Sequence, residues 1–302
     1  MSPARRKRAL KSLGKRPARL RRSVFAGPVA TIVVLMFMAP IVWFASTSLK
    51  QSGLTYQLPP AWLFQPTAEH YGNVVGLSKP LESLWQAGQI PNFSGAFLNS
   101  VIIAVGSTLL STCLGTLAAF GFARFRIRWE NAFLLGYLLI RMVPAVSLVL
   151  PLYQLFRILG LNDTYAGLII AESTFQVPFV VWMMTGFIRQ VPAELEESAM
   201  VDGLSRPRAM LRITVPLITP GLFATVIFNF VQAWNDFLYP LVLTSQNTQT
   251  LPVAIIGFIA EGNIFWGEMA AAGMLVLLPV ILFSMLAQRY IVAGATAGAV
   301  KG

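Results

Sequence analysis

The chain has 302 residues, of which 56% are hydrophobic and only 12% are charged, and its mean hydropathy is +0.66. Soluble domains carry about 25% charged residues, so this composition excludes an ordinary water-soluble fold. The single cysteine, Cys113, and the single histidine, His70, exclude a disulfide framework and a His/Cys metal cluster.

The basic residues are concentrated at the N-terminus. The formal net charge is +11, and ten of the 23 Lys and Arg residues lie between Arg5 and Arg22. A basic arm directly before an apolar segment fixes the orientation of a membrane span more simply than it binds nucleic acid, for which stacking aromatic side chains are missing. We therefore expect residues 1–24 to form a cytoplasmic arm without a nucleic-acid partner.

Six segments reach the length of about 20 apolar residues that an α-helix needs to cross a bilayer. They predict an all-α integral membrane protein with six transmembrane helices, the first at residues 25–49. This first segment is too long for the apolar region of a cleaved signal peptide. The six segments are Phe25–Leu49, Leu98–Phe122, Ala132–Ile158, Tyr165–Ile188, Leu217–Leu243 and Met269–Val292.

The distribution of Lys and Arg predicts the orientation of these spans. With the N-terminus in the cytoplasm, the cytoplasmic segments hold nineteen basic residues, and the outer segments hold two, Lys50 and Lys79. Basic residues accumulate on the cytoplasmic side of membrane proteins. Both the N-terminus and the C-terminus are therefore predicted to be cytoplasmic.

Residues 50–93 form a long extracytoplasmic connection between the first and second spans. It is rich in Pro and Trp, which include Pro59, Pro60, Trp62 and Trp85. This composition suits either a partly ordered cap that contacts an external partner or a plain spacer, and the sequence leaves both open.

Small side chains recur every four residues in the second span, at Ser107, Ser111, Gly115 and Ala119. Residues spaced by four lie on one face of a helix. In lipid, a face of small side chains allows close backbone approach and dispersion contacts between helices. We predict a helix-packing face here rather than a binding site.

Two charged residues, Arg141 and Glu172, fall inside the third and fourth spans. An ionised group in a membrane costs several kcal/mol unless it is paired or hydrated. With a helical rise of about 1.5 Å per residue, the two residues differ in depth by only about 4 Å. We predict an Arg141–Glu172 ion pair, with a place in a polar pathway as the alternative.

Residues 189–216 connect the fourth and fifth spans with a polar, helix-prone sequence on the cytoplasmic side. Pro192 suits the first turn of a helix, where no backbone N–H is needed. Carboxylates follow it, where the positive end of the helix dipole favours them. They are Glu194, Glu196 and Glu197. The spacing predicts one shared helix face for Leu195, Ala199 and Asp202.

A glycine is predicted to end this helix. Gly203 tolerates the left-handed conformation that closes a helix, and a second short helix is expected from about Arg206 to Ile213, before Pro216 opens the fifth span. The product is either a knob of two short helices that fits a cleft in a soluble partner or an amphipathic loop on the lipid surface. Periodicity alone leaves both open.

The same loop resembles the EAA loop of ATP-binding-cassette importer permeases. That pattern is Glu-Ala-Ala, three residues, Gly, nine residues, Ile, one residue and Leu-Pro, and this chain keeps the spacing with Ser198 for Ala and Val215 for Leu. The resemblance implies docking on ATPase subunits. The residues implied in this coupling are Glu197, Ser198, Ala199, Asp202, Gly203, Ile213 and Pro216.

A wider resemblance is to the sugar-importer permeases represented by the smaller membrane subunit of the maltose transporter. It covers most of the chain and includes Asn99–Ser100, the Trp-Asn-Asp-Phe-Leu stretch at 234–238 and the ending 292–302. The implied fold is a type I ABC importer permease, with residues 94–292 as its transport domain and 293–302 as a cytoplasmic tail. The implied partners are a second permease chain, two ATPase chains and an extracytoplasmic solute-binding protein.

Trp234, Asn235 and Asp236 lie in the outer third of the fifth span. Small-molecule sites combine aromatic walls with a few polar groups. Together with Arg141 and Glu172, these residues are therefore candidates for a transport path, and packing or capping is the alternative role.

With the resemblance, these features predict a permease subunit that imports a maltose- or trehalose-type sugar across the bacterial plasma membrane. The sequence contains no phosphate-binding GxxxxGK[ST] stretch, GxSxG elbow or HExxH motif. We therefore expect no catalytic residue, no metal site and no cofactor on this chain, with ATP and Mg used by the partner ATPases. Glycerol phosphate or another polar solute is the alternative substrate. A self-sufficient secondary transporter or a structural membrane anchor is the alternative function.

Overall fold

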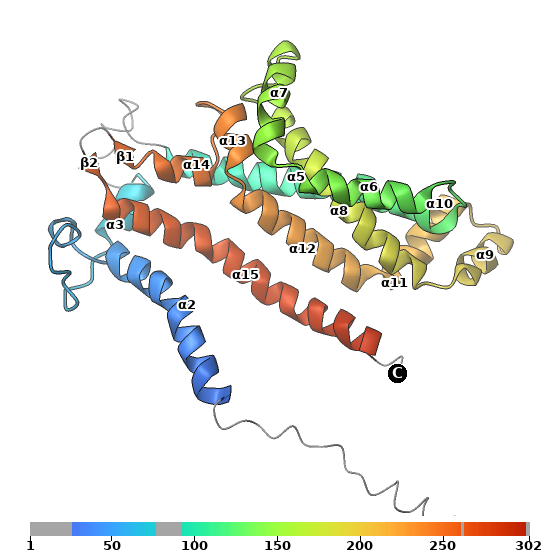
Figure 1. Cartoon of the computed structure of the whole chain (residues 1–302), viewed down its shortest axis with the longest axis horizontal. Coiled ribbons are helices and arrows are strands. Elements are labelled where there is room, and N and C mark those ends of the chain that lie inside the picture. Colours follow the sequence, from blue (N-terminus) through green and yellow to red (C-terminus); the bar gives the residue numbers. More distant parts are fainter. Residues whose placement is uncertain (1–25, 77–91, 261–262, 300–302) are drawn as a thin grey trace, which may run out of the picture. The chain divides into compact units, whose positions relative to one another are not determined.

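The computed structural model describes residues 26–76, 92–260 and 263–299, so the predicted basic arm lies outside the described residues (Figure 1). The chain divides into two compact units, residues 1–46 and residues 47–302. Most of helix α2 (Ala26–Ser48) belongs to the first unit. This apolar helix of 23 residues contains Pro40 and coincides with the first predicted span.

The second unit is built almost entirely of helices (Figure 1). Its long helices are α5 (Phe93–Arg124), α8 (Tyr165–Arg189), α12 (Thr219–Asn235) and α15 (Trp266–Ala299). The strands β1 (Ile259–Ala260) and β2 (Asn263–Ile264) form one short antiparallel pair. The shorter elements are η1 (Ser52–Leu54), α3 (Glu69–Val74), α6 (Glu130–Met142), α7 (Ala145–Ile158), α9 (Ala193–Val201), α10 (Arg206–Ala209), the π-helical turn η2 (Met210–Thr214), α11 (Val215–Leu217), α13 (Leu238–Leu243), α14 (Leu251–Ile256), β1 (Ile259–Ala260) and β2 (Asn263–Ile264).

The small residues of the second predicted span are confirmed as a packing face. Ser107, Ser111 and Ala119 are fully buried on α5, which packs against α8. A Cβ atom on Gly115 would lie 2.5 Å from Cβ of Val180 in α8, so only glycine allows this close approach. The Ser111 hydroxyl also donates to a buried amide oxygen of α8 at 2.7 Å.

Four described helical segments are long and apolar enough to cross a membrane: Gly27–Ser48, Phe93–Arg124, Tyr165–Arg189 and Trp266–Leu286. A fifth crossing is added if the bent pair Arg206–Leu217 and Thr219–Asn235, which meet at 81°, counts as one span. The last helix also continues beyond the predicted span end at Val292, as far as Ala299. The predicted total of six spans stays a proposal.

Two of the predicted spans were expected to be continuous helices, but the structure interrupts both. Ala132–Ile158 is divided into α6 and α7 at Val143 and Pro144, where Val143 is extended with ψ 126°. Pro144 has no backbone N–H, and its ring disfavours a helical conformation in the preceding residue. Leu217–Leu243 is divided at Asp236, between α12 and α13, with Asp236 extended at ψ 134°.

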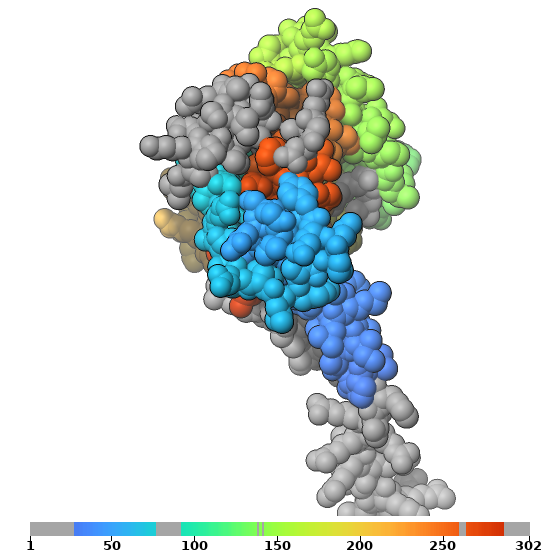
Figure 2. Space-filling view, turned by 90° about the vertical axis from the view of Figure 1, so that its left-hand side faces the viewer, coloured from blue at the N-terminus to red at the C-terminus, as the bar shows by residue number. Residues whose placement is uncertain are grey.

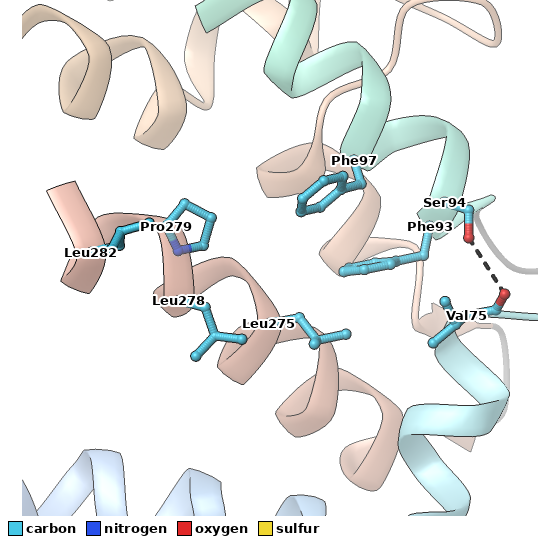
Figure 3. Close-up of a pocket in the computed structure, with 8 residues that line it drawn as sticks. All are labelled: Val75, Phe93, Ser94, Phe97, Leu275, Leu278, Pro279 and Leu282. Carbon is cyan, nitrogen blue, oxygen red and sulfur yellow. Dashed lines mark hydrogen bonds between the residues drawn. The ribbon is translucent and has the colours of Figure 1, made fainter.

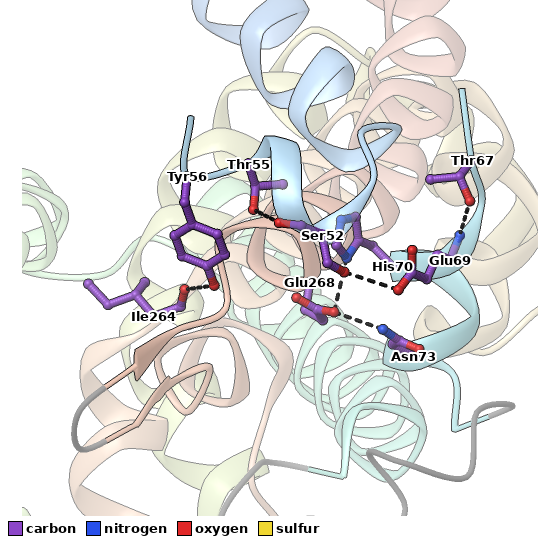
Figure 4. Close-up of polar contacts among 9 residues, drawn as sticks. All are labelled: Ser52, Thr55, Tyr56, Thr67, Glu69, His70, Asn73, Ile264 and Glu268. Carbon is purple, nitrogen blue, oxygen red and sulfur yellow. Dashed lines mark hydrogen bonds and ion pairs between the residues drawn. The ribbon is translucent and has the colours of Figure 1, made fainter. Parts of the chain in front are cut away.

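The described part of the predicted outer connection packs against the beginning of α15 (Figure 2, blue to cyan beside red-orange). Nδ1 of the buried His70 lies 2.9 Å from Oε1 of Glu268, and the Asn73 amide donates to the same oxygen at 2.8 Å (Figure 4). Burial lowers the pKa of His70, but the hydrogen bond and charge of Glu268 outweigh burial and raise the pKa overall. Residues 50–76 therefore form a cap on α15, and its contact with an external partner stays a prediction.

Asp163 ties two further connections together. Its carboxylate accepts hydrogen bonds of 2.6 to 3.2 Å from backbone and side-chain groups of Ser245, Asn247 and Thr248. Burial raises the pKa of Asp163, but these hydrogen bonds outweigh burial and hold the pKa well below its usual range. The Asn99 amide donates to the Asn247 carbonyl at 3.1 Å, so the start of α5 is anchored to the same loop.

Candidate functional site

The loop 189–216 folds as a helix, a glycine corner and a second helix, as the sequence predicts. α9 begins after Pro192, which is the cap residue with ψ 130° rather than a member of the first turn. Gly203 has φ +91°, and backbone hydrogen bonds to the carbonyls of Ala199 and Met200 close the helix end. α10, η2 and α11 then lead to α12.

A buried ion pair attaches this loop to the end of α5. Nε and Nη2 of Arg124 lie 2.9 and 2.8 Å from Oε1 of Glu196, and Nη2 also donates to the Val191 carbonyl at 2.9 Å. The Thr214 hydroxyl donates to the same carboxylate oxygen at 2.5 Å. The sequence predicts Glu196 only as a carboxylate at the positive end of the helix dipole, because the pattern within the loop carries no information about a partner 72 residues away.

The structure corrects the face predicted for α9. Of the predicted set, only Ala199 is buried. Leu195 is 44% exposed and Asp202 is exposed, because Glu196 turns inward to its ion pair instead. At the corner, Val201 is 89% exposed, so apolar surface is open to another molecule. The predicted coupling residues on the exposed surface of this corner are Glu197, Ser198, Asp202 and Gly203.

The last two predicted coupling residues lie further along the loop. Ile213 is half-buried in η2, and Pro216 is exposed in α11. π-Helical turns are rare in proteins, and many of those that occur lie at functional sites. Both residues stand between the corner and α12 in the chain.

A polar cavity of about 410 Å³ lies where the two interrupted spans meet α8. Its walls come from the break between α6 and α7, from α8, and from the end of α12 with the start of α13. Of the predicted transport-path residues, Glu172 and Asp236 are part of this wall. The lining residues are Met142, Val143, Pro144, Ala145, Glu172, Phe175, Gln176, Asn229, Gln232, Asp236 and Tyr239.

Two buried polar atoms of this wall have no hydrogen-bond partner within the described part of the chain. They are Oε1 of Glu172 and the hydroxyl oxygen of Tyr239. Tyr239 stacks on Phe175 with ring centroids 4.7 Å apart. Asp236 accepts two long backbone hydrogen bonds of 3.4 Å at the start of α13. Buried polar groups are normally paired, so these atoms mark the cavity as a place where a ligand can bind.

The other predicted transport-path residues lie elsewhere. Arg141 is in α6 directly before the cavity, but its side chain lies outside the described residues, and the Arg141–Glu172 ion pair stays a prediction. Trp234 is 1% exposed and donates from Nε1 to the Val276 carbonyl at 3.2 Å, inside the core. Asn235 is exposed, and its amide donates to a carbonyl one turn back in α12 at 2.7 Å.

A second cavity, of about 520 Å³, lies between α5 and α15 and is apolar (Figure 3). Phe93 and Phe97 face Leu278 and Leu282 across it. Ser94 is the one residue of its lining with a polar side chain, and its hydroxyl donates to a backbone carbonyl at 3.4 Å. Such walls offer a polar solute almost no hydrogen-bonding partner, so this cavity is not the candidate site.

The amino-acid sequence is similar to those of known transport proteins. Residues 111–296 match the family described as binding-protein-dependent transport system inner membrane component. The chain is 35% identical over 285 residues to the trehalose transport system permease protein SugB of Mycobacterium tuberculosis, covering 93% of this chain and 99% of that protein. It is 31% identical over 275 residues to the trehalose/maltose transport system permease protein MalG of Thermococcus litoralis, covering 90% of this chain and 95% of that protein.

One solved structure has the same fold. It is a crystal structure of a bacterial ABC transporter involved in the import of the acidic polysaccharide alginate. One of its chains matches with a TM-score of 0.73 and 20% identity, over 91% of this chain and 99% of that chain. The match supports the type I importer permease fold that the sequence predicts.

Proposed function

This chain belongs to the family of binding-protein-dependent transport system inner membrane components, and on that premise we propose that it is the permease subunit of an ATP-driven sugar importer. It is accordingly a multi-pass protein of the inner membrane. Relatives of 35% and 31% identity are named for trehalose and maltose transport. They support a di- or oligosaccharide of that kind as the substrate.

The exposed corner of the loop 189–216 is the observation that carries the coupling role. The helix end at Gly203 and the Glu196 ion pair fix the position of α9. The apolar side chains of Val201 and Leu195 remain exposed on its surface. A firm, partly apolar knob suits a cleft in a soluble partner better than a lipid surface. We infer that this knob docks in a cleft of an ATPase subunit. When the two ATPase subunits close on ATP, they move the corner against α12.

The proposed assembly has four further kinds of component. They are a second permease chain, two ATP-binding-cassette ATPase chains, an extracytoplasmic solute-binding protein and the sugar. In this proposal the chain crosses the membrane six times with both termini in the cytoplasm, and ATP is hydrolysed only by the partner ATPases. The chain's own part is mechanical and conductive.

Crosslinking from a single introduced cysteine that carries a photoactivatable maleimide tests the docking and the orientation together. Cys113 is exposed, so it is first replaced by serine. A cysteine at Asp202 is expected to crosslink to an ATPase subunit. A cysteine at Gln57, an exposed position on the predicted outer cap, is the matched control and is expected not to reach the ATPase. Crosslinks of Asp202→Cys to lipid reagents alone would contradict the proposal.

Reconstitution separates the proposal from a secondary transporter. Proteoliposomes that contain the complete complex and the binding protein are expected to accumulate trehalose or maltose only when ATP is supplied. Uptake by this chain alone under an ion gradient, without ATPase subunits, would favour a secondary transporter instead.

A further inference from the structure

We propose that the polar cavity at the two span breaks is a subsite for one neutral, hydroxyl-rich sugar unit on its way through the membrane. The proposal rests on the proposed function and adds to it the residues of this chain that contact the solute. Glu172, Tyr239 and Gln232 are the expected hydrogen-bonding groups, and Phe175 is the expected aromatic wall.

Both interrupted spans open onto this one cavity. Irregular backbone at membrane depth persists only where it is buried in protein or borders a polar space. The break at Val143 and Pro144 and the break at Asp236 come from separate parts of the chain, yet all three residues line the cavity. Broken helices of this kind form solute sites in transporters. Two of them at one polar space indicate a polar occupant.

The cavity wall carries hydrogen-bonding atoms that the described part of the chain leaves without a partner. Glu172 and Tyr239 are only 6% and 5% exposed, and Oε1 of the first and the hydroxyl of the second are unpartnered there. An unsatisfied buried polar group is destabilising, so a ligand that pairs with both atoms is favoured. A carboxylate oxygen accepts from a sugar hydroxyl, and a phenol donates or accepts. The exposed Gln232 adds an amide that does both.

The size and the apolar parts of the wall suit a sugar ring. The volume of about 410 Å³ falls within the range of roughly 300–1,000 Å³ that is typical of small-molecule sites. Phe175 and Tyr239, which stack on one another, and the side chains of Val143 and Pro144 offer surface to the C–H faces of a ring. Hydroxyl groups at the ring edge then meet the polar atoms of α8 and α12.

The charge of the lining favours a neutral solute. Glu172 and Asp236 are the two acidic residues of the described lining, their carboxyl groups lie close enough to interact, and the described lining residues include no Lys, Arg or His. An anion in this cavity would meet like charge, which is strongly unfavourable in a desolvated site. A hydroxyl that donates to a carboxylate forms a charge-assisted hydrogen bond. The described lining therefore favours a neutral sugar over a sugar phosphate or a uronate.

Equilibrium binding tests the subsite directly. Radiolabelled trehalose and maltose are titrated onto the detergent-purified complex of permeases and ATPases without the binding protein. Tyr239→Phe removes only the unpartnered hydroxyl, and Glu172→Gln replaces the carboxyl group by an amide of nearly the same shape. Each is expected to weaken sugar binding about three- to tenfold. Tyr153→Phe, the same change on α7 outside the lining, is expected to stay within about twofold of the unaltered complex.

Three outcomes would each overturn the subsite. The two variants could bind sugar with the same affinity as the Tyr153→Phe control, or the unaltered complex could bind no sugar. Glycerol 3-phosphate could also displace the bound sugar. Binding-protein-stimulated ATP hydrolysis reports whether each variant is assembled, and if Glu172→Gln fails to assemble, Tyr239→Phe decides. ATP-driven uptake by the unaltered complex is measured in parallel. If uptake is present while the subsite fails, the proposed function stands; if uptake is absent, the proposed function fails.

Discussion

Replacement of Arg124 by methionine removes one partner of the buried ion pair that holds α9 against α5. The Arg124 guanidinium lies 2.8 and 2.9 Å from Oε1 of Glu196 and 2.9 Å from the Val191 carbonyl. Methionine keeps an apolar stem of similar length but makes none of these contacts. Glu196 then keeps only its hydrogen bond from Thr214 within the described part of the chain.

The size of the effect follows from burial. The two side chains are 10% and 6% exposed, so solvent screens their interaction little. Loss of one partner of a buried pair costs about 3–5 kcal/mol, because the other charge stays buried without compensation. At 1.4 kcal/mol for each factor of ten, the docked form of α9 loses about two to three and a half orders of magnitude in its equilibrium constant. We expect ATP-driven sugar uptake to fall by at least about tenfold.

The assay compares uptake in proteoliposomes with the amount of ATPase that co-purifies. Arg124→Met is expected to reduce both, and the double variant Arg124→Met with Glu196→Leu is expected to recover a substantial part of both, since no unpaired charge remains. Uptake by Arg124→Met within about twofold of the unaltered protein would refute the reasoning. So would a double variant whose loss equals the sum of the two single losses.

Three further changes follow from the same structure. Gly203→Ala is expected to reduce uptake moderately, because an L-residue at φ +91° costs about 1–2 kcal/mol although its Cβ meets open space. Gly115→Ala is expected to lower the thermal midpoint of the purified protein, because its Cβ would lie 2.5 Å from Cβ of Val180 and overpacking costs about 1–3 kcal/mol. The thermal midpoint is also expected to fall as the pH rises above about 6.5, because the pKa of His70 is raised in the folded protein. The stabilisation by the ion pair with Glu268 is then fully present below the unfolded pKa of about 6.5 and is lost as pH rises through the folded pKa.

Each of these changes has a matched control. Gly186→Ala and Gly121→Ala lie in helices with no atom within 4 Å of the added Cβ, so neither is expected to lose stability or uptake. Equal effects of Gly115→Ala and Gly121→Ala would contradict the close approach of α5 and α8. His70→Gln is expected to remove most of the pH dependence, and an unchanged slope would assign that dependence to other groups.

Local physics made the coupling loop and the packing face predictable. The left-handed conformation at Gly203 needs only a residue without Cβ, and the four-residue spacing of Ser107, Ser111 and Gly115 needs only the geometry of a helix. The length and hydropathy of the apolar segments likewise predicted α2, α5, α8 and α15 within a few residues at most ends. These features depend on neighbours in the chain, which the sequence displays directly.

Tertiary structure alone decided which face of α9 is buried and which polar residues share a cavity. Glu196 turns inward because Arg124, distant in the chain, reaches its carboxylate. Glu172 and Tyr239 line one cavity because two interrupted helices fold back against α8. A hydropathy average measures only how apolar a segment is. It does not show where a proline interrupts the helix or which distant residue contacts it. The pairing of buried charges and the walls of a cavity are set by such long-range contacts, and no local pattern encodes them.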